Sequence, residues 1–250
     1  MERGFYRSAV FFGLGVNSAE SDTLTEFHLS KYTNLRLVPP EVSPATLNDW
    51  KNELRTWVIM SGFCEMVDCL CISLNQIYTA ASIAGREYSP EKIEAFEGRG
   101  LPGKLRDLEK DYGIRGWDSE KVASFGGIRN CFIHRKGRVG KADLRSKEVI
   151  SIHYIRFNSF CSTKDGEFPI DVFDPNSPTF TVPEGGAKLA LRINEAEKSF
   201  KGGDVIGFSP KELAEIMFFA RYSSRVLLGS LFDFIKSKGI RIVETGNHSD

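Results

Sequence analysis

The sequence has no excess of charge of either sign. Its 33 Lys and Arg residues balance 33 Asp and Glu residues, so the formal net charge is zero and the pI is about 6.9. This balance argues against a polybasic protein that coats nucleic acid over its whole surface, although it leaves room for a local basic patch. With 250 residues, of which 41% are hydrophobic, the chain can bury a full core without help from a metal or a disulfide.

The sequence also lacks the marks of a secreted, metal-bound or membrane protein. Its cysteines are odd in number, and three of them lie in one apolar segment, which favours a reducing compartment. The Cys-Leu-Cys spacing within that segment does not suit zinc, and no run approaches the roughly 18 apolar residues of a membrane span. With no signal peptide visible, we expect a cytoplasmic protein that uses no metal or other cofactor and does not bind membranes. The cysteines are Cys64, Cys69, Cys71, Cys131 and Cys161.

Three Ser-Pro dipeptides predict helix starts. Ser43-Pro44, Ser89-Pro90 and Ser209-Pro210 each precede a segment of helical character. A serine side chain can accept from free backbone N–H groups, and proline fits the first helical position. The third start is the strongest, because Glu212 lies three residues after Ser209 and completes a capping box.

Apolar periodicity predicts two long helices. The first runs from Leu47 to a stop at Gly85, with Trp50 and Trp57 in its apolar stripe and a middle part that should be buried nearly all round. The second runs over 211–238. At 1.5 Å per residue, each is about 40 Å long, which suits the scaffold of a helical bundle.

Shorter segments complete the predicted fold. Helices are expected after Ser89, over 101–112 and over 119–134, whereas β-branched and alternating residues over 149–157, 179–182 and 189–193 predict a small antiparallel sheet. The fold class is therefore mainly α, a helical bundle with a small antiparallel β insert, α+β overall. The predicted organisation is an N-terminal segment packing on the bundle (1–42), a helical core (43–140), a β-rich insert (141–208), and a long C-terminal helix with a short tail (209–250).

One segment carries a recognisable motif. Arg129-Asn130-Cys131-Phe132-Ile133-His134 has the form R-N-x-x-x-H and is followed by two basic residues and a glycine. In a chain of this composition that form should arise by chance roughly 0.01 times. The segment resembles the signature of HEPN domains, a helical family named from higher eukaryotes and prokaryotes nucleotide-binding, in which many members are metal-independent RNases.

The resemblance implies a HEPN-like bundle and a function. It suggests an endoribonuclease acting as a toxin or an abortive-infection (phage defence) effector. Its motif helices would meet across a homodimer, and an inhibitory antitoxin protein could hold it inactive. In that scheme His134 is the acid/base, Arg129 is the cation on the phosphate, and Asn130 orients His134 or the phosphate. RNA is then the substrate.

The residue types suit this chemistry on physical grounds alone. Histidine, with an ordinary pKa of about 6.5, can both take and give a proton near neutrality, and arginine offers a charged planar fork to phosphate oxygens. Asn130 and His134 share a helical face, but Arg129 and His134 lie about 140° apart on an ideal helix. They converge if Arg129 reaches round, if the helix ends near Ile133, or if a second subunit contributes.

Basic residues are concentrated around the motif. From Arg129 to Lys147 there are seven, against the single acid Asp143, a local net charge of plus six. This indicates an anion site, or else a solvated basic loop. The predicted RNA-binding residues are Arg135, Lys136, Arg138 and Lys141.

Some features depart from the pattern or remain open. Gly126-Gly127 should weaken a helix interior, so either the helix starts there or another backbone packs close, as at a dimer seam. Asp68, or next Glu65, is the candidate for an additional acid, with pairing to an arginine as the structural alternative. The G-x-x-x-x-G-K match that ends at Lys104 lacks the Ser/Thr of a P-loop.

Two other functions stay open from the sequence. The chain could be a non-catalytic HEPN-like module that binds RNA or a nucleotide through the same basic patch. It could also be a helical interaction protein in which the motif is incidental. In the second case His134 should turn into the core. For His153, which lies in a predicted strand, a structural role is expected whatever the function.

Overall fold

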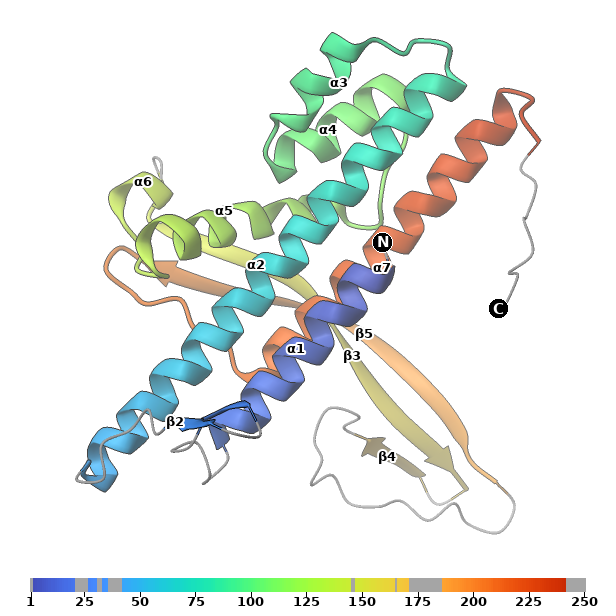
Figure 1. The fold of residues 1–250 in the computed structure, drawn as a ribbon. Coiled ribbons are helices and arrows are strands. Elements are labelled where there is room, and N and C mark those ends of the chain that lie inside the picture. Colours follow the sequence, from blue (N-terminus) through green and yellow to red (C-terminus); the bar gives the residue numbers. More distant parts are fainter. Residues whose placement is uncertain are drawn as a thin grey trace.

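A computed structural model describes residues 2–20, 27–30, 33–35, 42–144, 147–164, 166–170 and 186–241. Figure 1 shows the elements in chain order. The helices are α1 (Glu2–Glu20), α2 (Pro44–Ala84), α3 (Pro90–Glu97), α4 (Leu101–Tyr112), α5 (Ser119–Arg135), α6 (Lys141–Leu144) and α7 (Pro210–Ser237). The strands are β1 (Phe27–Ser30), β2 (Thr33–Leu35), β3 (Val149–Thr163), β4 (Gly166–Ile170) and β5 (Lys188–Lys201).

The three predicted helix starts are confirmed. The hydroxyls of Ser43, Ser89 and Ser209 accept hydrogen bonds from backbone N–H groups three residues on, at the starts of α2, α3 and α7. At α7 the Glu212 carboxylate accepts in return from the Ser209 N–H at 2.8 Å, which completes the predicted capping box. Gly239 follows the end of α7 and has a φ of +74°, the left-handed conformation in which helices commonly end.

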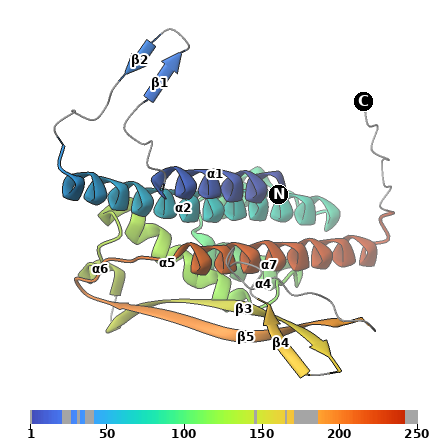
Figure 2. The ribbon, with the colours of Figure 1, turned by 90° about the horizontal axis from the view of Figure 1, so that it is seen from below.

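The two long helices form the centre of a layered arrangement. Helices α2 and α7 pack against each other, and α1 lies along α2 and also contacts α7. Strand β3, which pairs with β5, packs on α5 and α7. In Figure 2 the sheet lies on the side opposite α1 and α2, with α7 and α5 between. The mainly helical fold with a small antiparallel sheet is confirmed.

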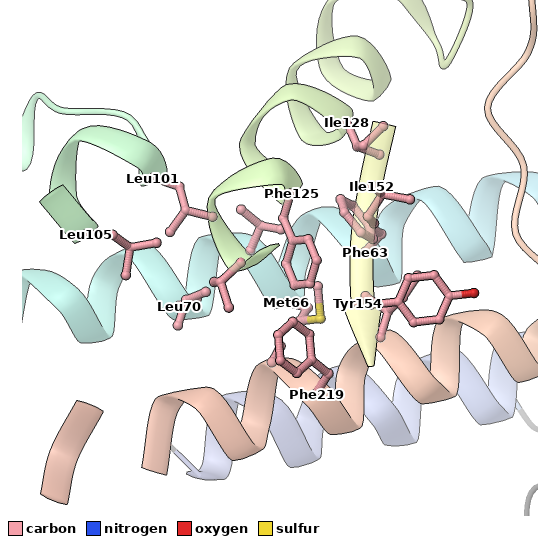
Figure 3. Close-up of a cluster of buried hydrophobic side chains, with 14 of the residues drawn as sticks. Phe63, Met66, Leu70, Leu101, Leu105, Phe125, Ile128, Ile152, Tyr154 and Phe219 are labelled. Carbon is pink, nitrogen blue, oxygen red and sulfur yellow. The ribbon is translucent and has the colours of Figure 1, made fainter. Parts of the chain in front are cut away.

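One hydrophobic core joins the helices to the sheet. Phe63 of α2, Phe125 of α5, Tyr154 of β3 and Phe219 of α7 are all buried in it (Figure 3). The β-rich region therefore shares the core of the bundle. Burying a side chain of this size stabilises the fold by about 1.5–3 kcal/mol, so these few contacts fix how the sheet lies against α5.

The start of α2 corrects one expectation. Every buried residue of this helix lies at or beyond Val58, so its middle and end are enclosed as predicted. Trp50 and Trp57, however, are 41% and 61% exposed. Trp57 directly precedes the buried Val58 and Ile59, so the helix is covered at this level and Trp57 lies on its uncovered face.

The sheet follows the predicted strands in part. β3 pairs with β5 from Val149↔Lys201 to Ser162↔Lys188, and β4 pairs with the end of β3, giving the order β4-β3-β5. The segments 149–157 and 189–193 are strands, as predicted, whereas 179–182 lies outside the described residues. The N-terminal segment, which the pattern left unassigned, contains α1 and the β1–β2 hairpin.

Helix α2 also corrects the expectation about long apolar runs. It contains an 18-residue window with a mean hydropathy of 1.6, long and apolar enough to cross a membrane, and half of that window is buried inside the fold. The central helix of a bundle has the same composition, because it is covered on several sides.

Candidate functional site

Helix α5 positions the motif. Its buried face carries Ile128, Cys131 and Phe132, which leaves Asn130 and His134 exposed and Arg129 half-buried. The helix continues through Arg135, so it does not end near Ile133, which was one way the motif residues could converge. His134 therefore lies in the last helical turn, on the surface and not in the core.

A broad cleft of about 1430 Å³ follows α5 and contains the three predicted catalytic residues. Arg129, Asn130 and His134 all line it, and Asp68 of α2 lines it with them. Residues of α2 and α4 form one wall, and the segment leading into β3, β3 itself and Glu195 of β5 form the other. Asn130 and His134 share one face of α5, and Arg129 reaches the same cleft from the neighbouring side of the helix, where it meets Asp68.

The Arg129 side chain is held by an ion pair. Its Nε and Nη2 atoms lie 2.9 and 2.8 Å from the same Oδ1 atom of Asp68, and its Nη1 donates to Asn130 Oδ1 at 3.4 Å. This is the arginine pairing that the sequence offered for Asp68, and the arginine is that of the motif. The other acidic candidate, Glu65, pairs with Arg7 of α1 and does not line the cleft.

Arg135, a predicted RNA-binding residue, is engaged by a buried carboxylate. It also lines the cleft, but its guanidinium pairs through two nitrogens with Asp143, whose side chain is only 2% exposed. The Gly140 N–H donates to the same carboxylate at 2.8 Å. Burial raises the pKa of Asp143, but the hydrogen bonds from Arg135 and Gly140 more than offset this, and its pKa lies below the ordinary value.

The other predicted RNA-binding residues lie outside the lining of this cleft. Lys136 ends α5 with a φ of +50°, Arg138 donates to the Gly203 carbonyl at 3.1 Å, and Lys141 is exposed on α6. Lys147 does line the cleft, whereas Arg145 falls outside the described residues. The basic segment is therefore divided between the cleft and the neighbouring surface.

Charges within the cleft are balanced, which the sequence window did not reveal. Its described lining includes six basic and six acidic residues, and most of them come from segments far apart in the chain. The 129–147 segment contributes three of these basic residues and one acid, a net of plus two, and the five acids from elsewhere in the chain exceed the three other basic residues by two. The basic residues are Arg99, Lys104, Lys121, Arg129, Arg135 and Lys147, and the acidic ones are Asp68, Glu97, Asp118, Glu120, Asp143 and Glu195.

The glycine pair before the motif allows close packing within this chain. Gly126 and Gly127 lie inside α5, so the helix does not start there. A Cβ atom at Gly126 would lie 3.1 Å from Pro102 Cδ of α4, and one at Gly127 would lie 3.1 Å from Ile150 Cδ1 of β3. The sequence predicted either a helix start or the close approach of another backbone, but the atoms that approach these glycines are side-chain atoms of the chain's own α4 and β3.

Other reactive side chains near the motif are occupied or protonated. Burial raises the pKa of Cys64 and of Cys131 to about 11, so both stay thiols at neutral pH. Lys104 is buried, and its Nζ atom donates to Asn75 Oδ1 and to the carbonyls of Phe96 and Glu97 at 2.6–2.8 Å. It therefore caps the end of α3 and is not free to bind phosphate, in line with the rejected P-loop.

The structure adds His153 to the cleft, where the sequence had assigned a structural role. Its backbone N–H donates to Ser124 Oγ of α5 at 3.0 Å, which places the strand beside the motif helix, and its ring is 41% exposed. Only the strand register could reveal this, because nothing near His153 in the chain marks a site.

Within the described part of the chain, no group of three or more His, Cys, Asp or Glu side chains could hold a metal ion. No known family, curated protein or solved structure matches the sequence or the fold.

Proposed function

We propose that the protein is a HEPN-like endoribonuclease that cleaves RNA without a metal. The observation that carries the proposal is the meeting of Arg129, Asn130 and His134 in one cleft, with the guanidinium of Arg129 held by Asp68. The bonds from Arg129 to Asp68 and Asn130 support this grouping, because they hold the guanidinium at the cleft. The position of His134 on the surface also speaks against a purely structural role.

The proposed chemistry is transfer of the phosphate to the neighbouring 2′-hydroxyl. A base removes the 2′-hydroxyl proton, the 2′-oxygen bonds to phosphorus, and the bond to the 5′-oxygen breaks as an acid returns a proton to it. The product is a 2′,3′-cyclic phosphate and a free 5′-hydroxyl. His134 supplies the proton transfers, Arg129 stabilises the charge on the phosphate oxygens, and Asn130 orients the phosphate or His134.

Asp68 acts as a positioning residue in this scheme. Both bonds from Arg129 go to one of its carboxylate oxygens, so the guanidinium is oriented before RNA binds. The third nitrogen, Nη1, points toward Asn130 and the cleft. A preoriented cation costs less entropy at the transition state than a mobile one.

One histidine per chain supplies only part of the catalysis. Acid/base catalysis contributes about 10²–10⁴ in rate, and one electrostatic donor adds about 10²–10³. We therefore propose that two copies bring their motif helices together, so that one His134 acts as base and the other as acid. Ile133, exposed beside His134 on α5, offers apolar surface for such an interface.

The proposed cellular role follows from the same resemblance. An RNase whose site needs no cofactor is active once folded, so a cell must restrain it. A toxin or abortive-infection effector in the cytoplasm, held inactive by an inhibitory protein, fits that requirement.

Cleavage of single-stranded RNA in EDTA by the purified protein tests the proposal. His134→Ala and Arg129→Ala should each lower the rate at least 100-fold, and Arg129→Lys should recover little, since lysine lacks the planar fork. The matched control is Arg106→Ala, because Arg106 is exposed, lies outside the cleft and forms its ion pair with the neighbouring Asp107. No cleavage by the wild type, or equal rates for wild type and His134→Ala, would overturn the enzymatic proposal.

The oligomeric state is measured in the same samples. Light scattering should give a mass of twice 28.0 kDa. Replacing Ile133 by Glu should yield a monomer that keeps its thermal stability and loses activity. An active monomer would contradict the two-copy site.

A non-catalytic module that binds RNA or a nucleotide is the second candidate. It requires the Arg129 guanidinium in the cleft but no proton transfer by His134. It predicts binding that survives His134→Ala, is lost with Arg129→Ala, and weakens steeply as salt is raised.

A further inference from the structure

The cleft has two ends of different chemical character, and α5 runs between them. The motif end contains Arg129 and His134, and the acidic end contains Lys121 and Glu195. Lys121 and His134 are thirteen residues apart on the helix, about 20 Å at 1.5 Å per residue. That span accommodates several nucleotides of a stacked strand, at about 3.4 Å each.

The motif end is suited to phosphate. Its two ion pairs, Arg129 with Asp68 and Arg135 with Asp143, are each neutral as a pair. Lys147 and His134 also line this end, and among the described residues neither has an ion-pair partner. Because both ion pairs are neutral, the ammonium of Lys147 gives this end a net positive charge.

The acidic end is unsuited to phosphate. Three carboxylates, those of Asp118, Glu120 and Glu195, line it together with the ammonium of Lys121. Lys121 lies 2.7 Å from Asp118 and 3.1 Å from Glu195, so its charge is already compensated. The remaining negative charge repels phosphate and favours a group that donates hydrogen bonds.

A network of polar side chains on the paired strands β3 and β5 lies at this end of the cleft. Ser151 and Ser199 share a hydrogen bond of 2.6 Å, and Ser199 donates to Glu197 at 2.8 Å. The second oxygen of Glu197 lies 3.8 Å from His153 Nδ1. Hydrogen bonds from Ser199 and Ser151, together with the nearby His153, lower the pKa of Glu197. The ionised carboxylate of Glu197 therefore lies beside the half-exposed imidazole ring of His153.

We propose, resting on the proposed RNase function, that the acidic end is a nucleobase subsite. The flat ring of His153 stacks on a base, and the carboxylate of Glu195 accepts a hydrogen bond from its exocyclic amino group. Adenine, cytosine and guanine carry such a group. The exocyclic groups of uracil are both carbonyl oxygens, which a carboxylate repels.

The distance along α5 sets the position of the recognised base. The scissile phosphate lies between Arg129 and His134, and Ser124, which binds the backbone of His153, lies five residues before Arg129. The intervening rise of about 8–12 Å corresponds to two or three nucleotides. The protein should therefore prefer an amino-bearing base two or three nucleotides from the cleaved bond.

DNA oligonucleotides with a single ribonucleotide test this subsite. Cleavage needs a 2′-hydroxyl, so each substrate has one cleavable bond, and the bases at the three positions on either side are varied in turn. At one position, kcat/KM should be about tenfold higher for adenine, cytosine or guanine than for uracil, the discrimination typical of a good base contact. Binding of the same oligonucleotides to the His134→Ala protein is measured in parallel.

Three variants separate the two contacts. Glu195→Ala should abolish the preference by lowering kcat/KM for the amino-bearing bases to the value for uracil. His153→Ala should weaken binding of all bases several-fold, and His153→Phe should restore it, because a phenyl ring also stacks. The matched control is Glu94→Ala, an exposed glutamate of α3 outside the cleft, which should keep the preference.

Failure of the subsite differs from failure of the RNase proposal. Cleavage without a base preference, or a preference that survives Glu195→Ala, would overturn the subsite and leave the RNase intact. If the wild type cleaves nothing but the His134→Ala protein still binds amino-bearing oligonucleotides about tenfold more tightly, the subsite stands and the RNase fails. Absence of binding and cleavage together would overturn both.

Discussion

Arg135 separates a structural role from an RNA-binding role more sharply than any other residue of the basic segment. Its guanidinium is joined through two nitrogens to Asp143, whose side chain is 2% exposed. Arg135→Ala removes both charged donors and leaves this carboxylate with weaker, uncharged donors, the Gly140 N–H and the Cys131 thiol. Losing one partner of a buried charge pair typically costs about 3 kcal/mol, and in a chain of this length that lowers Tm by about 6–12 °C.

Asp143→Asn should cost less, and the double variant should show the coupling. Arg135 is partly exposed, so water can solvate it when its partner is neutral. Removing both charges relieves the buried carboxylate, and the double variant should be more stable than Arg135→Ala alone. Urea unfolding of the four proteins measures the coupling energy, which we expect to be about 1.5–3 kcal/mol.

The pH dependence gives an independent check on this pair. In the wild type the pKa of Asp143 is below its ordinary value, so its stabilisation is present at neutral pH and is lost as pH falls below about 4. In Arg135→Ala, burial without the arginine raises the pKa of Asp143. This carboxyl group is then protonated at a higher pH than in the wild type, which removes the cost of burying an unpaired charge. The stability gap should therefore narrow between pH 7 and pH 4.

One result would refute this reasoning. If Arg135→Ala unfolds within about 0.5 kcal/mol of the wild type and loses RNA affinity, Arg135 is an RNA contact and the buried pair contributes nothing.

The remaining predictions concern the packing of α7 and α5. Ser209→Ala removes the capping box and should lower the free energy of unfolding by about 1 kcal/mol, measured in urea. Gly126→Ala should be destabilising by thermal melting, because its Cβ would meet the rigid ring of Pro102 at 3.1 Å. Gly127→Ala should be neutral or stabilising, because alanine favours the helix by about 1 kcal/mol and the atom it meets is the flexible end of Ile150. Equal Tm shifts for the two glycine variants would contradict the packing argument.

Local chemistry predicted the helix boundaries well. A serine hydroxyl followed by proline satisfies the first N–H groups of a helix from within the same short segment, so Ser43, Ser89 and Ser209 could be identified without any tertiary information. The alternation and β-branching of residues 149–157 predicted a strand for the same reason.

Properties that depend on distant partners were predicted less well. Trp50 and Trp57 fit a core stripe, but both are exposed, because the sequence of α2 does not tell which of its faces the neighbouring helices cover. The plus six of residues 129–147 was a correct count. It could not show that Asp68, sixty-one residues away in the chain, neutralises Arg129.

The sequence by itself determined the motif, the helix starts and the mixture of bundle and small sheet, because each of these depends on neighbours along the chain. Only the tertiary structure decided that Arg129 is oriented by Asp68, that Arg135 holds a buried carboxylate, and that His153 lies in the same cleft as His134. The physical reason is that charge and hydrogen bonding act over a few ångströms in space, and folding brings together groups that the chain keeps far apart.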